Sequence, residues 1–411
     1  MSCPPSGEQI RAEALALLPA AVELRRRIHR WPELGLDLPR TQQAVLDGLA
    51  GLPVDVVVGK ALSSVVATLE GDGPGPTIVL RADMDALPQH ETTGLDFASE
   101  RDGIMHACGH DAHSAMLVGA ARLLAGHRQS LAGRVRFVFQ PGEEGHHGAR
   151  LMLEEGVLDG PGVGAAFAIH SLPTSLSGHV GCLPGSFLAS SDGLRMTMRG
   201  RGGHACAPDQ SLDPIPAACE AVLAMQSFMS RRVDPADPAV LSITRLAAGT
   251  GDGVIPDEVT MEGTVRAHSE PARAAVLGAV RRILDGVAAA HELVADVVVE
   301  EGYPPLINDG EFTRWVVDVA RQVVGERYVH VWDRPVMSSD DFAFVLARVP
   351  GAMVALGSLP PGVERPAPNH SGAMILDEPA MATGMALQAG VALSYLAGES
   401  GRRPAPLSAD W

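Results

Sequence analysis

The chain has 411 residues, of which 46% are hydrophobic and 20% charged, a balance typical of a globular protein with two domains and a sizeable core. Its formal net charge of −17 argues against binding to nucleic acid or to an anionic membrane surface, because both carry charge of the same sign. We therefore expect a small-molecule partner.

The first residues contain no basic segment followed by a long apolar one, so we expect no signal peptide, and no apolar run is long enough to span a bilayer. The cysteines do not follow the spacing of a disulfide framework, which fits a reducing compartment. They are Cys3, Cys108, Cys182, Cys206 and Cys219. We expect a cytoplasmic protein.

Short apolar runs alternate with helical patterns over the first part of the chain. We expect helices at 8–30, 41–52, 112–125 and 149–158, and strands at 77–83, 135–139 and 165–169. Continuous apolar runs of this length are typical of strands buried in a mainly parallel sheet. The alternation predicts an α/β domain.

Polar side chains follow each of the three predicted strands. Asp83 and Asp85 follow the first strand, Glu143 and Glu144 follow the second, and His170 follows the third. In open α/β sheets the active site forms at the carboxyl ends of the strands. We therefore expect these side chains to meet in one crevice.

A different pattern begins near residue 190, where the elements read β-α-β-β-α-β with helices at 213–231 and 271–291. This order predicts a compact, ferredoxin-like α+β domain with a four-stranded sheet and two helices on one face. The α/β pattern then resumes. We expect a catalytic domain at 1–189 and 302–411, interrupted by an inserted domain at 190–301, and a loosely held tail at 402–411.

The most informative segment runs from Met105 to His113 and reads MHACGHDAH. Cys108 and His110 can face one ion only where the chain turns sharply, and Gly109 permits such a turn. A thiolate, an imidazole and nearby carboxylates suit zinc, manganese, cobalt or nickel better than calcium or magnesium. The alternative is a buried free cysteine flanked by core histidines whose hydrogen bonds are satisfied.

Glu143 and Glu144 are adjacent on a glycine-rich turn, and we expect different roles for them. One carboxylate can bind metal while the other takes a proton from a metal-bound water. Asp83 and Asp85 lie at a strand end, where a carboxylate can orient a metal-bound imidazole. Taken alone, each feature has a structural alternative: solvated surface glutamates, a strand-terminal turn, a core histidine at 170 and a loop histidine at 370.

Together these motifs resemble the dinuclear metal-dependent amidohydrolases of the aminoacylase and carboxypeptidase G type. The branch that is most similar holds hippurate hydrolases, N-acyl-amino-acid amidohydrolases and indoleacetyl-amino-acid hydrolases. The resemblance covers nearly the whole chain in fixed order, through IHRWPELG, LRADMDALP, MHACGHDAH, FQPGEEG, AIHSLP, GGHACAP, VIPD, GTVR, DDFAF and NHSG.

The resemblance implies that two divalent metal ions per subunit are held by Cys108, His110, Glu144, His170 and His370, with Cys108 bridging them. It implies that Glu143 is the general acid and base, and that Asp85 orients a ligand. His204 would stabilise the oxyanion in the partner subunit of a homodimer formed through the inserted lid and dimerisation domain. Arg266 would bind the substrate carboxylate.

The sequence also departs from the family pattern near the substrate. Gly253 stands where relatives commonly have an asparagine that helps to hold the substrate, and Asp340 replaces a glutamate. Pro208-Asp209 replaces Pro-His, and His370 lies in Asn-His-Ser-Gly rather than Leu-His-x-Pro. These changes leave the expected ligands and Glu143 in place and bear on which substrate is used.

We expect a metal-dependent amidohydrolase that cleaves the amide bond of a small N-acyl amino acid or a related conjugate. A dipeptidase or N-carbamoyl-amino-acid hydrolase on the same fold is the alternative enzyme. A catalytically silent binding protein is the alternative outside enzymes, and loss of Glu143 or of a ligand would have favoured it.

Overall fold

The computed structural model describes residues 5–160 and 162–397, which form two compact units. The first unit contains the described residues up to Gly185, Ile307–Arg334 and the described residues from Phe344 onward. The second unit contains Ser186–Leu306 and Pro335–Ala343. The tail predicted at 402–411 lies outside the described residues.

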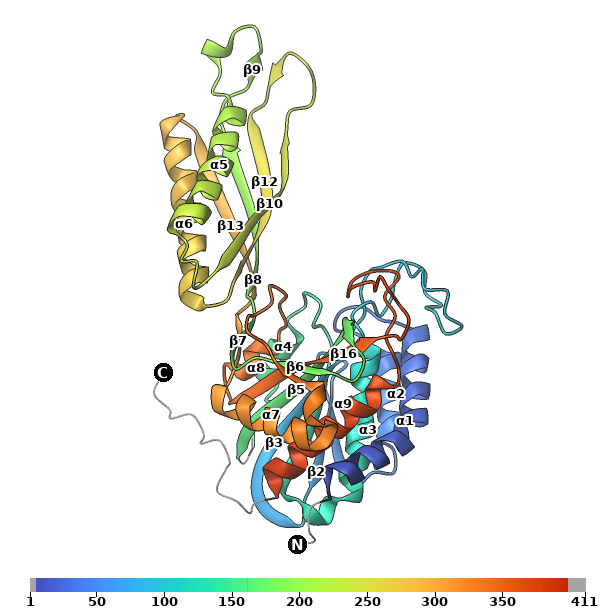
Figure 1. The fold of residues 1–411 in the computed structure, drawn as a ribbon. Coiled ribbons are helices and arrows are strands. Elements are labelled where there is room, and N and C mark those ends of the chain that lie inside the picture. Colours follow the sequence, from blue (N-terminus) through green and yellow to red (C-terminus); the bar gives the residue numbers. More distant parts are fainter. Residues whose placement is uncertain (1–4, 161, 398–411) are drawn as a thin grey trace. The chain divides into compact units, whose positions relative to one another are not determined.

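An eight-stranded sheet forms the centre of the first unit (Figure 1). In spatial order its strands are β1 (Val54–Val58), β2 (Val65–Glu70), β4 (Ala132–Gln140), β3 (Gly73–Asp83), β5 (Val163–Leu176), β16 (Gly351–Leu359), β6 (Val180–Cys182) and β15 (Val329–Val331). The pairs β4–β3, β3–β5, β5–β16 and β6–β15 are parallel. The prediction of an α/β fold with a mainly parallel sheet is confirmed.

The helices of the first unit surround this sheet, and four of them, α1, α3, α7 and α9, pack against one another. The helices are α1 (Gly7–Arg30), α2 (Pro39–Leu49), α3 (His110–Gly126), α4 (Gly148–Glu154), α7 (Gly310–Val324), α8 (Ala343–Leu346, which begins at the unit boundary) and α9 (Ala380–Leu396). Helices α3 and α9 are apolar nearly all round, which is typical of helices buried inside a large domain.

The boundaries of several elements differ from the sequence expectation, and three of these differences have a clear local cause or a consequence for the site. Helix α2 begins at Pro39, two residues early, because proline suits the first helical position. Helix α4 ends at Glu154, four residues early, and the chain turns at the following Gly156 with a φ of +85°. Strand β5 continues to Leu176, so His170 lies within a strand and not after one.

The second unit contains a four-stranded antiparallel sheet with helices α5 (Pro214–Arg232) and α6 (Glu270–Ala290) on one face (Figure 1). Its strands in spatial order are β10 (Ala239–Ala248), β12 (Glu258–Ala267), β8 (Ser191–Arg199) and β13 (Val294–Tyr303). Buried and partly exposed side chains alternate along β8 and β12, as expected for a sheet covered by helices on one face.

A buried ion pair joins helix α6 to this sheet. The Arg273 guanidinium donates to both carboxylate oxygens of Asp192, at 2.8 and 2.6 Å. The hydrogen bonds and charge of Asp192 raise the pKa of Arg273 above its usual value, so the pair stays ionised.

Short strands complete the second unit and its connections. A two-stranded ribbon pairs β9 (Gly203–His204) with β11 (Val254–Ile255). Strands β7 (Gly185–Leu188) and β14 (Leu306–Asn308) lie at two of the four points where the chain passes between the units. Among the described residues, every helix is too short or too polar to traverse a bilayer.

Candidate metal centre and active site

Six side chains that can bind metal or move protons gather in the first unit, at the carboxyl end of its parallel strands. Three sets have ligand atoms that all lie within 4.8 Å of one another: Cys108, His110 and His170; Cys108, Glu144 and His370; and His110, Glu143 and Glu144. Because these sets share members, the structure brings all five predicted metal ligands together with Glu143.

The first turn of helix α3 sets the directions of Cys108 and His110. Gly109 precedes the helix with a φ of +84°, the left-handed region that glycine adopts without steric cost. A Cβ atom at this position would lie 2.3 Å from Ser171 Oγ, so the chain also passes too close to β5 for any side chain. Cys108 Sγ lies 3.5 Å from His170 Nε2 as a result of this approach.

Asp85 holds the turn that carries the two glutamates. Its carboxylate accepts hydrogen bonds from the backbone N–H groups of Glu143 and Glu144, both at 2.9 Å. Its Oδ1 also lies 3.6 Å from His110 Nδ1. Asp85 is buried, so one carboxylate fixes the position of the Glu143–Glu144 turn and faces an imidazole.

His370 reaches the cluster from a loop late in the chain. Its Nε2 lies 3.2 Å from Glu144 Oε1, and its backbone N–H donates to Ala107 O at 2.7 Å. The interaction with the Cys108 side chain, followed by that with Glu144, raises the pKa of His370 to about 10. His370 therefore contacts residues that precede it in the sequence by more than two hundred positions.

The donor atoms of the cluster fit divalent metal ions. His110 is fully buried, and neither of its ring nitrogens makes a hydrogen bond within the part of the chain that the structure describes. Burial would raise the pKa of the Cys108 thiol, but the charges of His170 and His110 outweigh burial and hold that pKa well below its usual value. A thiolate, three imidazoles and a carboxylate crowded together form a donor set for zinc, manganese, cobalt or nickel.

A second layer of buried residues packs behind the cluster, and of these the sequence reasoning considered Asp83 but assigned no role to Arg81 or His113. Arg81 donates to Asp83 at 2.6 Å, and the other oxygen of Asp83 accepts from His113 Nδ1 at 2.6 Å. His113 Nε2 then accepts the backbone N–H of Ser171 at 2.8 Å. These hydrogen bonds fix the position of Ser171, the residue after His170. In the sequence, an arginine inside the otherwise apolar strand β3 was the feature that could have indicated this buried layer.

Asp111 anchors the same turn of α3 to helix α1. Its Oδ2 accepts from Arg25 Nε at 2.9 Å and from His29 Nδ1 at 2.8 Å, and all three side chains are buried. Burial lowers the pKa of His29, but the Asp111 carboxylate outweighs this effect and raises the pKa to about 9. The turn that carries His110 is therefore held by charged groups from a distant part of the chain.

The other predicted site residues lie in the second unit. His204 in β9 is paired with Val254 in β11, and Gly253 O accepts the backbone N–H of Ala205 at 2.9 Å, so the structure brings His204 and Gly253 side by side. Gly253 has a φ of +76°, a conformation that asparagine tolerates better than most residues.

Arg266, in β12, has a separate setting within the second unit. Its Nη1 donates to Met337 O at 2.9 Å and to Ser339 Oγ at 3.3 Å. Burial lowers its pKa from the usual value. Among the described residues, the structure gives this guanidinium no carboxylate partner, so its charge is available to an anionic ligand.

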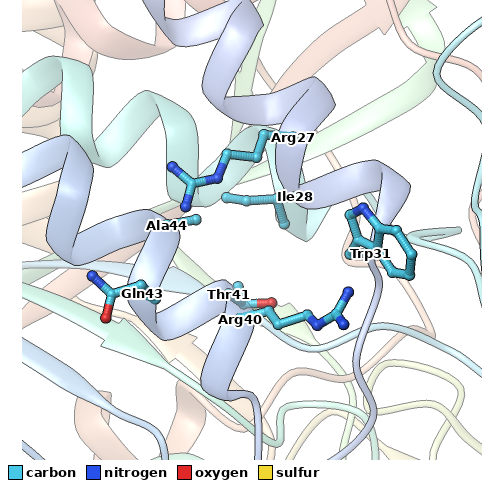
Figure 2. A pocket seen from close by; sticks show the side chains of 7 residues that line it. All are labelled: Arg27, Ile28, Trp31, Arg40, Thr41, Gln43 and Ala44. Atoms are coloured by element: carbon cyan, nitrogen blue, oxygen red, sulfur yellow. The ribbon is translucent and has the colours of Figure 1, made fainter.

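Figure 2 shows a cavity elsewhere in the first unit, between helices α1 and α2. It has a volume of about 210 Å³ and is lined by Arg27, Ile28, Trp31, Arg40, Thr41, Gln43 and Ala44. The Arg40 guanidinium stacks over the Trp31 ring at 4.3 Å from its centroid. None of the predicted site residues lines this cavity, so we assign the active site to the cluster around Cys108.

A mainly parallel α/β unit in which a thiolate, imidazoles and carboxylates gather within metal-binding distance of one another is the arrangement of a metal-dependent hydrolase. The sequence pattern of peptidase family M20/M25/M40 matches residues 79–394. The chain belongs to this family, and the resemblance stated from its motifs is confirmed.

Known relatives cover almost the whole chain. The N-acetylcysteine deacetylase of Bacillus subtilis (strain 168) is 40% identical over 88% of this chain and 92% of its own. The IAA-amino acid hydrolase ILR1-like 4 of Arabidopsis thaliana is 36% identical over 91% of this chain and 85% of its own. The solved structure of the Bacillus subtilis YxeP protein, a dinuclear metal binding peptidase from the M20 family, has a TM-score of 0.80 and 36% identity, covering 93% of this chain and 99% of that one.

Proposed function

We propose that the protein hydrolyses the amide bond of a small N-acyl amino acid or a related conjugate and releases a carboxylic acid and an amine. One observation carries this proposal: five ligand-type side chains meet beside Glu143, a carboxylate placed to act as a base. The names of the deacetylase and the indoleacetyl-amino-acid hydrolase among the relatives support the substrate class.

The proposed ligands of two divalent ions are Cys108, His110, Glu144, His170 and His370. Cys108 is the proposed bridging ligand because it belongs to both the set with His170 and the set with His370. When bound, such ions lower the pKa of water and polarise the substrate carbonyl. Zinc, manganese, cobalt and nickel all suit this donor set.

Glu143 is the proposed general base and acid. It is buried, and its Oε2 lies 3.9 Å from His110 Nε2, at the edge of the cluster. A carboxylate held there takes the proton of the attacking water and then returns it to the leaving amine. Asp85 accepts the backbone N–H groups of both Glu143 and Glu144 and so fixes the position of one glutamate relative to the other.

His204 is the proposed donor to the oxyanion. The backbone N–H of Cys206 donates to His204 Nδ1 at 3.2 Å, so in the neutral ring Nε2 carries the proton. An Nε2–H group can donate to a developing negative charge, and a donor of this kind contributes about 3 kcal/mol in comparable sites. We propose that it acts in the partner subunit of a homodimer formed through the second unit.

Arg266 is the proposed receptor for the substrate carboxylate. Its guanidinium is half-buried and oriented by Met337 O and Ser339 Oγ, and a planar cation of this kind binds carboxylates with two hydrogen bonds. Gly253, beside His204, offers no side-chain donor, and we propose that it widens the pocket there. We also propose a cytoplasmic location, because Cys108, Cys182, Cys206 and Cys219 are free.

A substrate panel tests this function. The purified, metal-analysed protein is incubated with N-acetyl, N-benzoyl and longer N-acyl amino acids, with N-carbamoyl amino acids and with unblocked dipeptides, and free amine is measured. We expect release of amine from N-acylated substrates, dependent on manganese, cobalt or zinc and abolished by chelator. Cleavage of dipeptides or carbamoyl compounds alone would replace the proposed substrate class.

Mixing two inactive variants tests the shared site. We expect His204→Ala to lower kcat by about 10²–10³-fold, the usual cost of removing an oxyanion donor, without unfolding. Mixed with Glu143→Gln under conditions that exchange subunits, it should regain part of the activity, because one site of the mixed dimer then holds both native residues. Absence of recovery with subunit exchange demonstrated would exclude a site shared between subunits.

A further inference from the structure

The Asn369 side chain contacts the cluster at its sulfur. Asn369 Nδ2 lies 3.4 Å from Cys108 Sγ, 3.4 Å from Cys108 O and 3.3 Å from Ser171 O. All three neighbours are hydrogen-bond acceptors, so the NH₂ group must face them, and the reversed amide would place Oδ1 against three electron-rich atoms. The direction of the amide is thereby set.

The bond to sulfur is the best formed of the three. Ordinary N–H···O bonds measure about 2.7–3.2 Å, so both contacts to carbonyl oxygens are long. Sulfur is a larger atom than oxygen, so 3.4 Å is an ordinary length for a hydrogen bond that it accepts. Both carbonyls also have other donors, since His170 Nδ1 reaches Ser171 O at 2.9 Å and Ser171 Oγ reaches Cys108 O at 3.4 Å.

The opposite end of the amide has no stabilising partner. Asn369 Oδ1 is buried and makes no hydrogen bond to any described residue. A buried unpaired carbonyl opposes folding, and a leucine of nearly the same shape would remove it. The N–H group, and not the packing of the side chain, is therefore the feature that asparagine adds.

We propose that Asn369 is a positioning residue that donates a hydrogen bond to the Cys108 sulfur and so fixes and tunes this thiolate as a metal ligand. The inference rests on the proposed role of Cys108 in the metal centre. A donor to a ligating sulfur draws electron density from it and restricts its direction, and such partners adjust metal affinity and electronic properties. The adjacent His370 comes from the same loop. One segment would therefore supply a metal ligand, His370, and the side chain that adjusts a second ligand, Cys108.

Cobalt(II) is the probe, because a thiolate bound to it gives a charge-transfer absorption in the near ultraviolet. Removing the N–H donor raises the energy of the sulfur electrons, so in Asn369→Leu we expect this band at longer wavelength than in the native protein. We expect the affinity for cobalt, measured by chelator competition, to fall about 10-fold. The melting temperature of the metal-free variant should match that of the native protein.

Three further variants make the result decisive. Ser371→Ala changes the same loop on the other side of His370. The hydroxyl there accepts from Ala373 N at 3.3 Å and makes no bond to Cys108 among the described residues, so this variant should leave the band in place. Asn369→Ala should shift the band as Asn369→Leu does, which covers any misfit of leucine. A native band position in both Asn369 variants would overturn the inference, as would a fall in melting temperature without a shift.

Cys108→Ser separates this inference from the proposed function. It should abolish the charge-transfer band of the cobalt-loaded protein. If the native protein binds cobalt without such a band, Cys108 is not a ligand, and both the proposed metal centre and this inference fail. If the band is present in the native protein and unmoved in the Asn369 variants, only the inference about Asn369 fails.

Discussion

Replacement of Glu143 by glutamine is expected to reduce kcat by about 10²–10⁴-fold, the range that a positioned general base or acid contributes. Glutamine keeps the size of the side chain and its hydrogen-bonding capacity but cannot accept the proton of water. Glu143 is buried, and its backbone is held by Asp85, so the substitution should leave the fold intact. Steady-state kinetics together with metal analysis provide the measurement.

The neighbouring residue is the matched control for this prediction. Glu144→Gln makes the same chemical change one position along, on the same turn, at a carboxylate 3.2 Å from His370 Nε2. Because Glu144 is a proposed ligand, this variant should lose bound metal, whereas Glu143→Gln should retain it. The reverse pattern of metal contents would mean that the two carboxylates have exchanged roles.

Replacement of Gly109 by alanine is expected to lower the metal affinity by at least about 10–100-fold. This is the usual cost of removing a group that orients a metal ligand. Alanine would hold a φ of +84° only under strain, and its Cβ would lie 2.3 Å from Ser171 Oγ. A change in the backbone that relieves the strain, or a shift that relieves the contact with Ser171, would move Cys108 or His110, which lie on the two sides of Gly109. Chelator competition measures the loss of affinity.

A second glycine in the same helix provides the control. Gly126 ends α3, and a Cβ atom there meets nothing within 4 Å, so Gly126→Ala should leave metal affinity unchanged. The double variant Gly109→Ala with Ser171→Ala removes the hydroxyl that the new methyl group would strike and should recover part of the affinity. Native affinity in Gly109→Ala would show that the turn does not determine the ligand geometry.

The periodic and compositional signals predicted the fold well because they depend on short stretches of chain. Continuous apolar runs identified strands β3, β4 and β5, and the order of elements after residue 190 predicted the second sheet and its two helices. The end of α4 was less well predicted, since a helix end depends on a local turn at Gly156 and not on the apolar pattern.

The candidate site was predictable where its residues form dense motifs and not where single residues meet across the fold. MHACGHDAH and GEEG carry their chemistry in a few positions, so Cys108, His110, Glu143 and Glu144 stood out. Asn369 resembles any polar loop residue in the sequence, and its contact with Cys108 follows only from tertiary packing. The same holds for Arg81, whose partner Asp83 shows why a cation lies inside an apolar strand.

The late position of β16 and His370 in the sequence determines when the proposed metal centre can form during synthesis. This strand lies between β5 and β6, and His370 follows it, so the ribosome completes the catalytic half of the protein only after the whole second unit has been made. At translation rates of about 5–20 residues per second, the nascent chain carries Cys108 and His170 for roughly tens of seconds before His370 is available. The proposed ligand set is therefore complete only after the second unit has been synthesised, so metal cannot be held by all five side chains before that point.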